Sequence, residues 1–261
     1  MYQLIKFLQF LFSSKNHHGV HSPFVFQLVT KCLYDKSFYP EYKLLSKYRN
    51  ELFLDNQILE IDDFGVGSKV MVSKKRTVKQ IAKIAGSSKG FSKFAFRLAK
   101  YQNVQSILEL GTSLGLATSA LALSKPNIQI DTVEASRSVI LKAENQLSSI
   151  INNSKINFHH QTFDNFIRSL ASSVRYDLIF FDGNHQKEAT LRYFEQLLFT
   201  AHNDSVWVFD DIYWSKSMTQ AWEIIKEHPK VKVTIDLFQW GLVFFRREQE
   251  KEHFKLRPNF V

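Results

Sequence analysis

Two short stretches bring together the side chains best suited to chemistry. One reads Asp182-Gly-Asn-His185 and the other Asp210-Asp211, and each follows an apolar run. Three carboxylates repel one another unless a positive charge lies between them, and carboxylate oxygens suit a hard divalent cation such as Mg²⁺. Imidazole titrates near neutrality and can remove the proton of a hydroxyl group. We therefore predict that Asp182 and His185 are catalytic and that Asp182, Asp210 and Asp211 bind a metal ion.

Simpler roles exist for the same residues. His185 could cap the helix expected over 187–199, and Asp211 could cap the helix expected over 215–227. An acid in the position of Asp182 could contact substrate or cofactor without any metal. These alternatives stay open at the level of sequence.

The elements that must position these residues alternate regularly along the chain. Apolar runs without alternating polar positions predict strands covered on both faces, as in a parallel α/β sheet. The predicted strands are 107–110, 128–134, 156–160, 176–182 and 205–210, and the helices between or after them include 137–150, 187–199 and 215–227. Segments 231–236 and 241–245 stand too close for a helical crossover, so they should pair as an antiparallel hairpin at one edge. The fold class is therefore α/β, with a seven-stranded, mostly parallel sheet and an antiparallel C-terminal hairpin.

A glycine-rich turn follows the first of these strands. Gly111 and Gly115 have the spacing G-x-x-x-G between an apolar strand and a helix of small residues. Glycine allows positive φ and close approach of a ligand to the backbone, and the helix start offers unpaired N–H groups. The G-x-G-x-x-G pattern of dinucleotide turns is missing, so a nucleotide-type cofactor without a pyrophosphate fits better.

The stretch from 108 to 115, Leu-Glu-Leu-Gly-Thr-Ser-Leu-Gly, resembles the first motif of class I S-adenosylmethionine-dependent methyltransferases, in particular the O-methyltransferase branch that includes bacterial catechol and sugar enzymes. The resemblance covers roughly 86–247 and implies a Rossmann-like fold. It implies that the methionine part of the cofactor is surrounded by Glu109, Gly111, Thr112, Ser113 and Gly115. It also implies that Glu134 accepts hydrogen bonds from the ribose hydroxyls, a role that a carboxylate at a strand's carboxyl end can fill.

The rest of the resemblance bears on the other end of the sheet. Metal-dependent members carry an aspartate after strand four and an acidic pair after strand five, the positions of Asp182, Asp210 and Asp211. Near the adenine this chain has Phe163, with Asp164 displaced from the family's usual position, and Asp182 is a further candidate cofactor contact. Lysine is usual at the position of His185 in catechol-type relatives and histidine occurs in sugar-modifying ones, which favours an alcohol or sugar hydroxyl as acceptor.

We expect two regions, an N-terminal helical extension or lid over 1–85 and a cofactor-binding domain over 86–261. Residues 2–12 should form a helix whose narrow polar stripe leaves most of its surface to be covered, by the core, a second copy of the chain or a membrane surface; the core or a dimer is favoured. The histidines of 17–26 are expected in a loop joining two helices and not at a metal. Residues 62–68 imitate a glycine-rich turn, but no helix is expected after them.

The net charge of +9 is concentrated in one segment. Residues 69–100 contain ten basic residues and no acidic one. Such a segment could attract nucleic acid, an anionic membrane or a phosphorylated or carboxylated substrate. Apolar residues at helical spacing instead favour two amphipathic helices whose solvated faces carry the charges.

Composition limits the remaining possibilities. The 261 residues, 44% of them hydrophobic, suffice for one α/β core with an appendage. The single cysteine, Cys32, excludes an intrachain disulfide, and residues 2–12 lack the features of a signal peptide, so we expect a cytoplasmic protein.

The expected function is methyl transfer from S-adenosylmethionine to a hydroxyl of a small molecule, with a divalent cation and His185 as base. The alternatives are a metal-independent methyltransferase acting on an anionic or macromolecular acceptor, and a non-catalytic binding protein. Nucleic acid is not the expected partner, because an N-P-P-Y-type motif is missing after strand four. Peripheral membrane contact and a homodimer stay open.

Overall fold

A computed structural model of the chain describes residues 1–61, 74–84, 86–151 and 154–258. The expected turn at 62–68 and Lys69 of the basic segment lie outside these residues. The chain divides into two compact units. One combines Met1–Asp35 with the C-terminal part from Leu170, and the other is Lys36–Ser169. This division does not test the expected boundary at residue 85, which stays a prediction.

The first unit carries five strands of the sheet. Their order is β10-β8-β9-β7-β6. β6 and β7 are parallel, β9 is antiparallel to both β7 and β8, and β10 runs parallel to β8. The elements are α1 (Tyr2–Ser13), the 3₁₀ turn η1 (His17–Gly19), α2 (Pro23–Leu28), the π-helical segment η2 (Val29–Leu33), β6 (Leu178–Phe181), α9 (Lys187–Leu197), β7 (Val206–Asp210), α10 (Lys216–Glu227), β8 (Val233–Asp236), β9 (Trp240–Phe244) and β10 (Glu252–Lys255).

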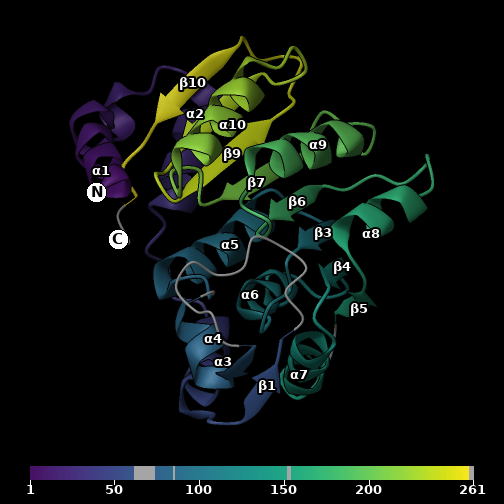
Figure 1. Cartoon of the computed structure of the whole chain (residues 1–261). Helices are drawn as coiled ribbons and strands as arrows, with labels where there is room; N and C mark the ends of the chain where they lie inside the picture. The colour runs from purple at the N-terminus through teal and green to yellow at the C-terminus, as the bar shows by residue number, and fades with distance from the viewer. Residues whose placement is uncertain (62–73, 85, 152–153, 259–261) are drawn as a thin grey trace. The chain divides into compact units, whose positions relative to one another are not determined.

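Every residue of β6, β7, β8 and β9 is buried, as the apolar runs predict. α9 and α10 lie side by side in this unit (Figure 1). The indole of Trp222 on α10 packs onto Gly241, where an added Cβ would lie 2.7 Å from the ring. A fully buried aromatic side chain removes roughly 150–250 Å² from water, so the buried Trp207, Trp222 and Trp240 are major contributors to this core.

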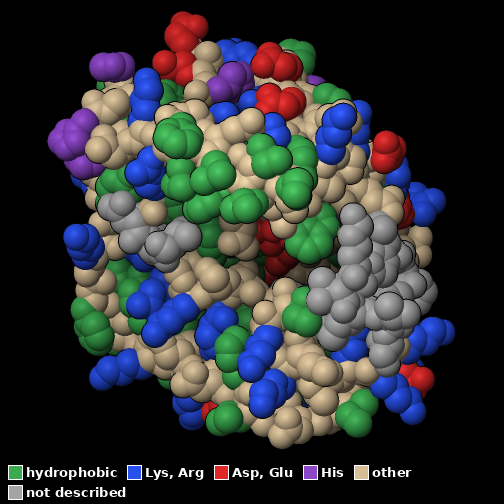
Figure 2. Space-filling model, turned by 60° about the vertical axis from the view of Figure 1, so that its left-hand side comes forward, with side chains coloured by type: hydrophobic (Ala, Val, Ile, Leu, Met, Phe, Trp, Pro, Cys, Tyr) green, Lys and Arg blue, Asp and Glu red, His purple; other side chains and the backbone are tan. Residues whose placement is uncertain are grey.

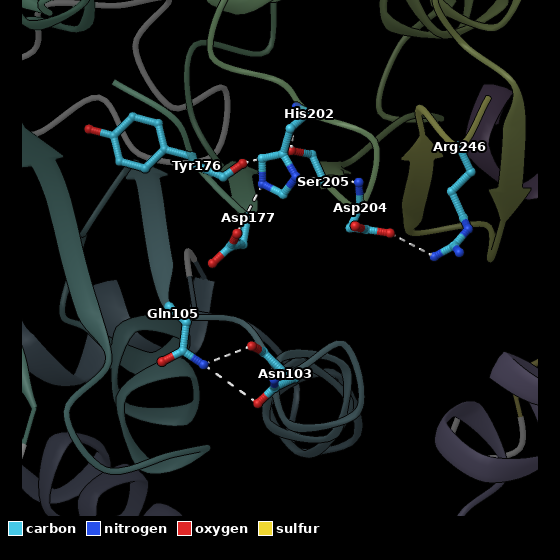
Figure 3. Close-up of polar contacts among 8 residues, drawn as sticks. All are labelled: Asn103, Gln105, Tyr176, Asp177, His202, Asp204, Ser205 and Arg246. Atoms are coloured by element: carbon cyan, nitrogen blue, oxygen red, sulfur yellow. Dashed lines mark hydrogen bonds and ion pairs between the residues drawn. The ribbon is translucent and has the colours of Figure 1, made fainter. Parts of the chain in front are cut away.

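The loops before β6 and β7 are tied together by polar contacts (Figure 3). The hydroxyl of Ser205 donates to the carbonyl of Tyr176 at 2.8 Å, and the ring of His202 lies 2.9 Å from Asp177 Oδ1. Arg246 pairs with Asp204 at 3.1 Å. The backbone N–H of His202, not its ring, contacts Ser205, so these residues do not form a Ser-His-Asp nucleophile. They fix the amino ends of the two strands whose carboxyl ends carry the predicted carboxylates.

The second unit contains the other three strands of the mostly parallel, eight-stranded sheet, in the order β3-β4-β5. All three are parallel. The elements are α3 (Glu41–Leu54), β1 (Ile58–Glu60), β2 (Lys75–Thr77), α4 (Val78–Ile84), α5 (Lys89–Tyr101), β3 (Ser106–Leu110), α6 (Leu116–Leu123), β4 (Gln129–Glu134), α7 (Arg137–Leu147), β5 (Lys155–His160) and α8 (Phe163–Ser169). α3, α5 and α6 pack on one another, and β1 and β2 form a separate antiparallel pair.

The predicted α/β class, the parallel strands and the antiparallel hairpin are confirmed, whereas the predicted number of strands and the place of the hairpin at the edge are wrong. The sheet has eight strands, because Glu252–Lys255 adds β10 alongside β8, so the hairpin does not form the edge. The residues of β10 are largely exposed and charged, so the sequence has no apolar run that would predict this strand. The N-terminal region contains the short strands β1 and β2 besides its helices.

The expected N-terminal helix is present as α1. Its Phe7 and Phe10 rings pack against Phe238, at 4.9 and 5.5 Å between centroids. The opposite face is uncovered and exposes Leu4, Ile5, Leu8 and Phe12. Contact with the core therefore accounts for only part of the apolar surface. Among the described residues, no helix is long and apolar enough to cross a membrane.

Candidate active site

The glycine-rich turn in the second unit closes tightly between β3 and α6. Gly111 has φ 111°, Ser113 φ 46° and Gly115 φ 72°, and the N–H of Gly115 donates to the carbonyl of Thr112 at 2.8 Å. Positive φ is readily available to glycine, whereas serine adopts it rarely. The turn leads directly into the start of α6 at Gly115, and the unpaired backbone N–H groups of a helix start favour anionic or polar ligands.

Helix α3 supports this turn from the side. The hydroxyl of Tyr48, which is fully buried, donates to the carbonyl of Leu114 at 2.7 Å. A Cβ on Gly115 would lie 2.7 Å from Leu147 Cδ1 and 3.1 Å from the Tyr48 hydroxyl, so a larger residue would not fit. Burial raises the pKa of Tyr48, which keeps the phenol protonated and donating. No sequence motif marks Tyr48.

Glu134 ends β4 beside the turn. Its Oε2 accepts from the N–H of Ser113 at 3.1 Å and its Oε1 accepts from the N–H of Ser136 at 3.0 Å. Burial raises the pKa of Glu134, and these backbone hydrogen bonds oppose that shift. Each carboxylate oxygen can accept a second hydrogen bond. The carboxylate is thus held in one orientation with acceptor capacity left for the two hydroxyls of a ribose.

Glu109 and Thr112 belong to a buried chain of hydrogen bonds. Thr132 Oγ1 donates to Glu109 Oε2 at 2.5 Å and lies 2.6 Å from Thr112 Oγ1. Because the Thr132 proton is engaged by Glu109, Thr112 is the donor to Thr132. Thr118 Oγ1 on α6 also donates to Glu109 Oε2, at 2.6 Å. Burial raises the pKa of Glu109 to about 7. Sequence reasoning missed both Thr118 and Thr132.

The second oxygen of Glu109 has no partner. Among the described residues, Oε1 of Glu109 is buried without a hydrogen bond. An unsatisfied buried acceptor is costly, so it marks a point where a bound donor would be favourable. The turn, Glu134 and Glu109 together fit the cofactor that the sequence indicates.

Phe163 begins α8, where Thr162 Oγ1 accepts from the N–H of Asn165 at 3.3 Å. Phe163 is half-buried. Its contact with an adenine ring stays a prediction.

The predicted carboxylates lie together at the carboxyl ends of β6 and β7 in the first unit. β6 and β7 are paired up to Phe181 and Phe209, so Asp182 and Asp210 are the next residues of adjacent parallel strands. The carboxyl groups of Asp182 and Asp210 share a hydrogen bond. Burial, reinforced by Asp182 and Asp211, raises the pKa of Asp210 well above its ordinary range. The crowding of these carboxyl groups thus disfavours the charged form of Asp210.

His185 faces this cluster from the loop after β6. Its Nε2 lies 3.9 Å from Asp211 Oδ2, and its ring centroid lies 6.4 Å from that of Trp214. Burial lowers the pKa of His185, and Asp211 partly offsets that shift. The imidazole is therefore neutral at physiological pH and able to accept a proton.

The capping roles considered for His185 and Asp211 are not the ones seen. α9 has Gln186 at its N-cap, not His185. α10 is capped by the side chain of Ser215, which accepts from the N–H of Met218, not by Asp211. Asp211 has φ 55° and Asn184 has φ 50°, backbone conformations uncommon for residues other than glycine. Such conformations concentrate at functional sites.

The cluster does not have the arrangement of a formed metal site. Among the described residues, no group of three or more His, Cys, Asp or Glu side chains is arranged to hold a metal ion, and this includes the histidines of 17–21. Asp210 Oδ1 is nonetheless buried without a hydrogen-bond partner in the described part of the chain.

Comparison with known proteins covers both the glycine-rich turn and the carboxylate cluster. Residues 108–212, from the glycine-rich turn to the residue after Asp211, match a family model described as a methyltransferase domain. This stretch is therefore similar to methyltransferase domains. A search of curated proteins gives no match.

Solved structures agree with the methyltransferase domain at the level of fold. A methyltransferase from Podospora anserina bound to S-adenosylhomocysteine superposes with TM-score 0.59 at 13% identity, covering 87% of this chain and 97% of that one. The Streptomyces achromogenes O-methyltransferase TomG in complex with S-adenosylmethionine gives 0.54 at 14%, covering 80% and 91%. An O-methyltransferase from Bacillus cereus in complex with S-adenosylhomocysteine gives 0.53 at 17%, covering 84% and 96%. The Rossmann-like fold expected of class I methyltransferases is thus confirmed.

Proposed function

We propose that this chain transfers the methyl group of S-adenosylmethionine to a hydroxyl group of a small-molecule acceptor. The observation that carries the cofactor assignment is the carboxylate of Glu134, which Ser113 and Ser136 hold at the end of β4 beside the turn at Gly115. Structural neighbours crystallised with S-adenosylmethionine or S-adenosylhomocysteine support the same cofactor.

In this proposal the second unit holds the cofactor. Glu134 accepts the ribose hydroxyls, the turn from Gly111 to Gly115 surrounds the methionine part, and Phe163 contacts the adenine. The unpartnered Oε1 of Glu109 is available to a donor group. Bound S-adenosylmethionine supplies an electrophilic methyl group on a sulfonium centre.

The first unit handles the acceptor proton. His185, neutral because burial lowers its pKa, accepts the proton that the hydroxyl loses. Asp211, 3.9 Å away, stabilises the imidazolium that results. Asp182 positions the acceptor or the cofactor. General-base catalysis of this kind contributes about 10²–10⁴-fold to the rate.

A divalent cation such as Mg²⁺ is a separable part of the proposal. Its support is the chemistry of Asp182, Asp210 and Asp211, whose crowded carboxyl groups raise the pKa of Asp210. Against it, the described side chains are not arranged as a metal site, so binding requires the carboxylates to converge. No step of the mechanism depends on the cation.

Calorimetric titration with S-adenosylhomocysteine, first with Mg²⁺ and then with a chelator, tests the cofactor without knowledge of the acceptor. We expect micromolar binding to wild type under both conditions. A panel of diols, phenols and sugars, scored by release of S-adenosylhomocysteine, then tests the acceptor class. Binding without turnover of any hydroxyl compound would favour a non-catalytic role, and absence of binding would reject the proposal.

A further inference from the structure

A basic groove lies on the second unit between α3 and α5. Its cationic lining residues are Lys43, Lys47, Lys89 and Lys93, and Arg49 lines the adjoining recess together with Ser46, Lys89 and Lys93. Lys and Arg side chains gather in the lower part of the face in Figure 2. Among the lining residues Glu51 is the single acid, and it pairs with Lys47 at 3.9 Å.

The inner cations of the groove are Lys89 and Lys93. Within the described part of the chain, neither Lys89 nor Lys93 forms an ion pair. The ammonium of Lys93 lies over the ring of Tyr42 at 4.8 Å, and burial together with the nearby Lys89 and Arg97 lowers its pKa. Neighbouring positive charges repel one another, so a bound anion would relieve an unfavourable interaction that already exists among these cations.

Arg49 is half-buried and likewise pairs with no carboxylate among the described residues. Its Nη2 donates to the carbonyl of Ser87 and, at 3.3 Å, to Ser92 Oγ. A guanidinium has five N–H donors, so donors are left for a ligand. This half-buried guanidinium also lies over the Phe53 ring at 5.4 Å, and it lines the wall of a recess that two lysines line as well.

The placement of the lysines also opposes helix stability. Lys89 is the first residue of α5 and Lys93 lies one turn later, and the first turn of α5 contains no acid. The start of a helix carries a partial positive charge, which favours acids there and disfavours lysine. A bound anion would offset this unfavourable placement.

We propose that this groove binds the phosphate group of a small phosphorylated molecule through Arg49, Lys89 and Lys93. A phosphate monoester carries about two negative charges and three terminal oxygens, which match converging lysine and arginine donors. The hydroxyl of Ser46 is a further donor, and the exposed ring of Phe38 at the outer lip offers an apolar contact to the rest of the molecule. The inference does not depend on methyl transfer.

The test is titration of the full chain with phenyl phosphate at low salt, followed by ¹H–¹⁵N spectra, with phenol as the uncharged control ligand. The variant K89Q/K93Q removes two cations from the groove. The matched control K79Q/K83Q removes two cations of α4, in the same basic segment but outside the groove lining. We expect at least 10-fold weaker binding in K89Q/K93Q, little change in the control, and wild-type shifts near the start of α5.

Equal weakening in both variants would mean non-specific charge attraction and would overturn the proposal, as would equal binding of phenol. A single-stranded oligonucleotide and phosphatidylglycerol vesicles form two further arms. Binding of either through Lys89 and Lys93 without binding of phenyl phosphate would reassign the groove to a macromolecular partner. If phosphorylated hydroxyl compounds bind and are also methylated, the groove holds the acceptor; binding without turnover assigns it to an effector.

Discussion

The imidazole Nε2 of His185 lies 3.9 Å from Oδ2 of Asp211. Two opposing influences act on this histidine: burial lowers its pKa, and the carboxylate raises it. A histidine with a lowered pKa is already deprotonated at neutral pH. In a plot of kcat against pH, the decline at low pH should therefore have an apparent pKa below the ordinary value of 6.5. The relationship makes the catalytic assignment testable through pH.

Replacement of Asp211 with asparagine removes the carboxylate that favours imidazolium. We therefore expect the acid limb of kcat to move to lower pH in Asp211→Asn. His185→Ala should lose about 10²–10⁴-fold in kcat and lose this limb altogether. Both variants should bind S-adenosylhomocysteine as wild type does. A limb that stays in place in Asp211→Asn would show that another group titrates.

Glu134→Gln should weaken S-adenosylhomocysteine binding by about 10–100-fold, because a hydrogen bond to a charged acceptor contributes about 1.5–3 kcal/mol. The amide also keeps only one of the two acceptor oxygens that Ser113 and Ser136 use. Calorimetry measures the change. Glu144→Gln, an exposed residue of α7, is the matched control, and an equal loss in both variants would reject the ribose assignment.

Tyr48→Phe should destabilise the chain by about 1–3 kcal/mol, since it leaves the buried carbonyl of Leu114 without its donor. The same change should weaken cofactor binding, because the turn at Gly115 loses its lateral support. Urea denaturation with and without S-adenosylhomocysteine separates the two effects. Lost stability with unchanged affinity would confine Tyr48 to a packing role.

The sequence predicts the fold best at the parallel strands. Apolar runs locate β6 and β7, in which every residue is buried, because a strand buried on both faces needs apolar side chains almost throughout. The strand β10 is not predictable in this way, because the hydrophobicity pattern of an edge strand with exposed charged residues does not differ from that of a loop.

The residues of the candidate site likewise fall into those that the sequence predicts and those that it does not. Residues at strand ends, such as Glu134, Asp182 and Asp210, are predictable because the ends of parallel strands converge. Tyr48 and the threonines beside Glu109 are not, because their contacts join segments far apart in the chain. Periodicity describes one element at a time and carries no information about such pairings.

The crowded carboxyl group of Asp210 gives a direct test of the cation. Burial and the neighbouring carboxylates raise its pKa and so disfavour its charged form. We expect Mg²⁺ to raise the Tm of wild type, because a cation bound by the folded state stabilises it. Asp210→Asn mimics the protonated group, so it should keep its Tm without metal and show a much smaller response to Mg²⁺. Activity unchanged in a chelator, with no response of Tm, would remove the cation from the mechanism.

The raised pKa of Glu109 should make the stability of the chain depend on pH. Its pKa is about 7 in the folded chain against an ordinary 4.5, because the fully buried carboxyl group disfavours its charged form. Between these values the folded state binds more protons than the unfolded state, so the free energy of unfolding should fall as pH rises from 4.5 to about 7 and then level off.

The full effect corresponds to about 3 kcal/mol from this one group. Glu109→Gln cannot ionise, so its stability should lose this slope and exceed that of wild type above pH 7, provided that the amide keeps the contacts with Thr118 and Thr132. Urea denaturation at pH 5, 6, 7 and 8 measures the slope. An unchanged slope in Glu109→Gln would assign the titration to Glu134 or Asp210, whose pKa values are also raised by burial.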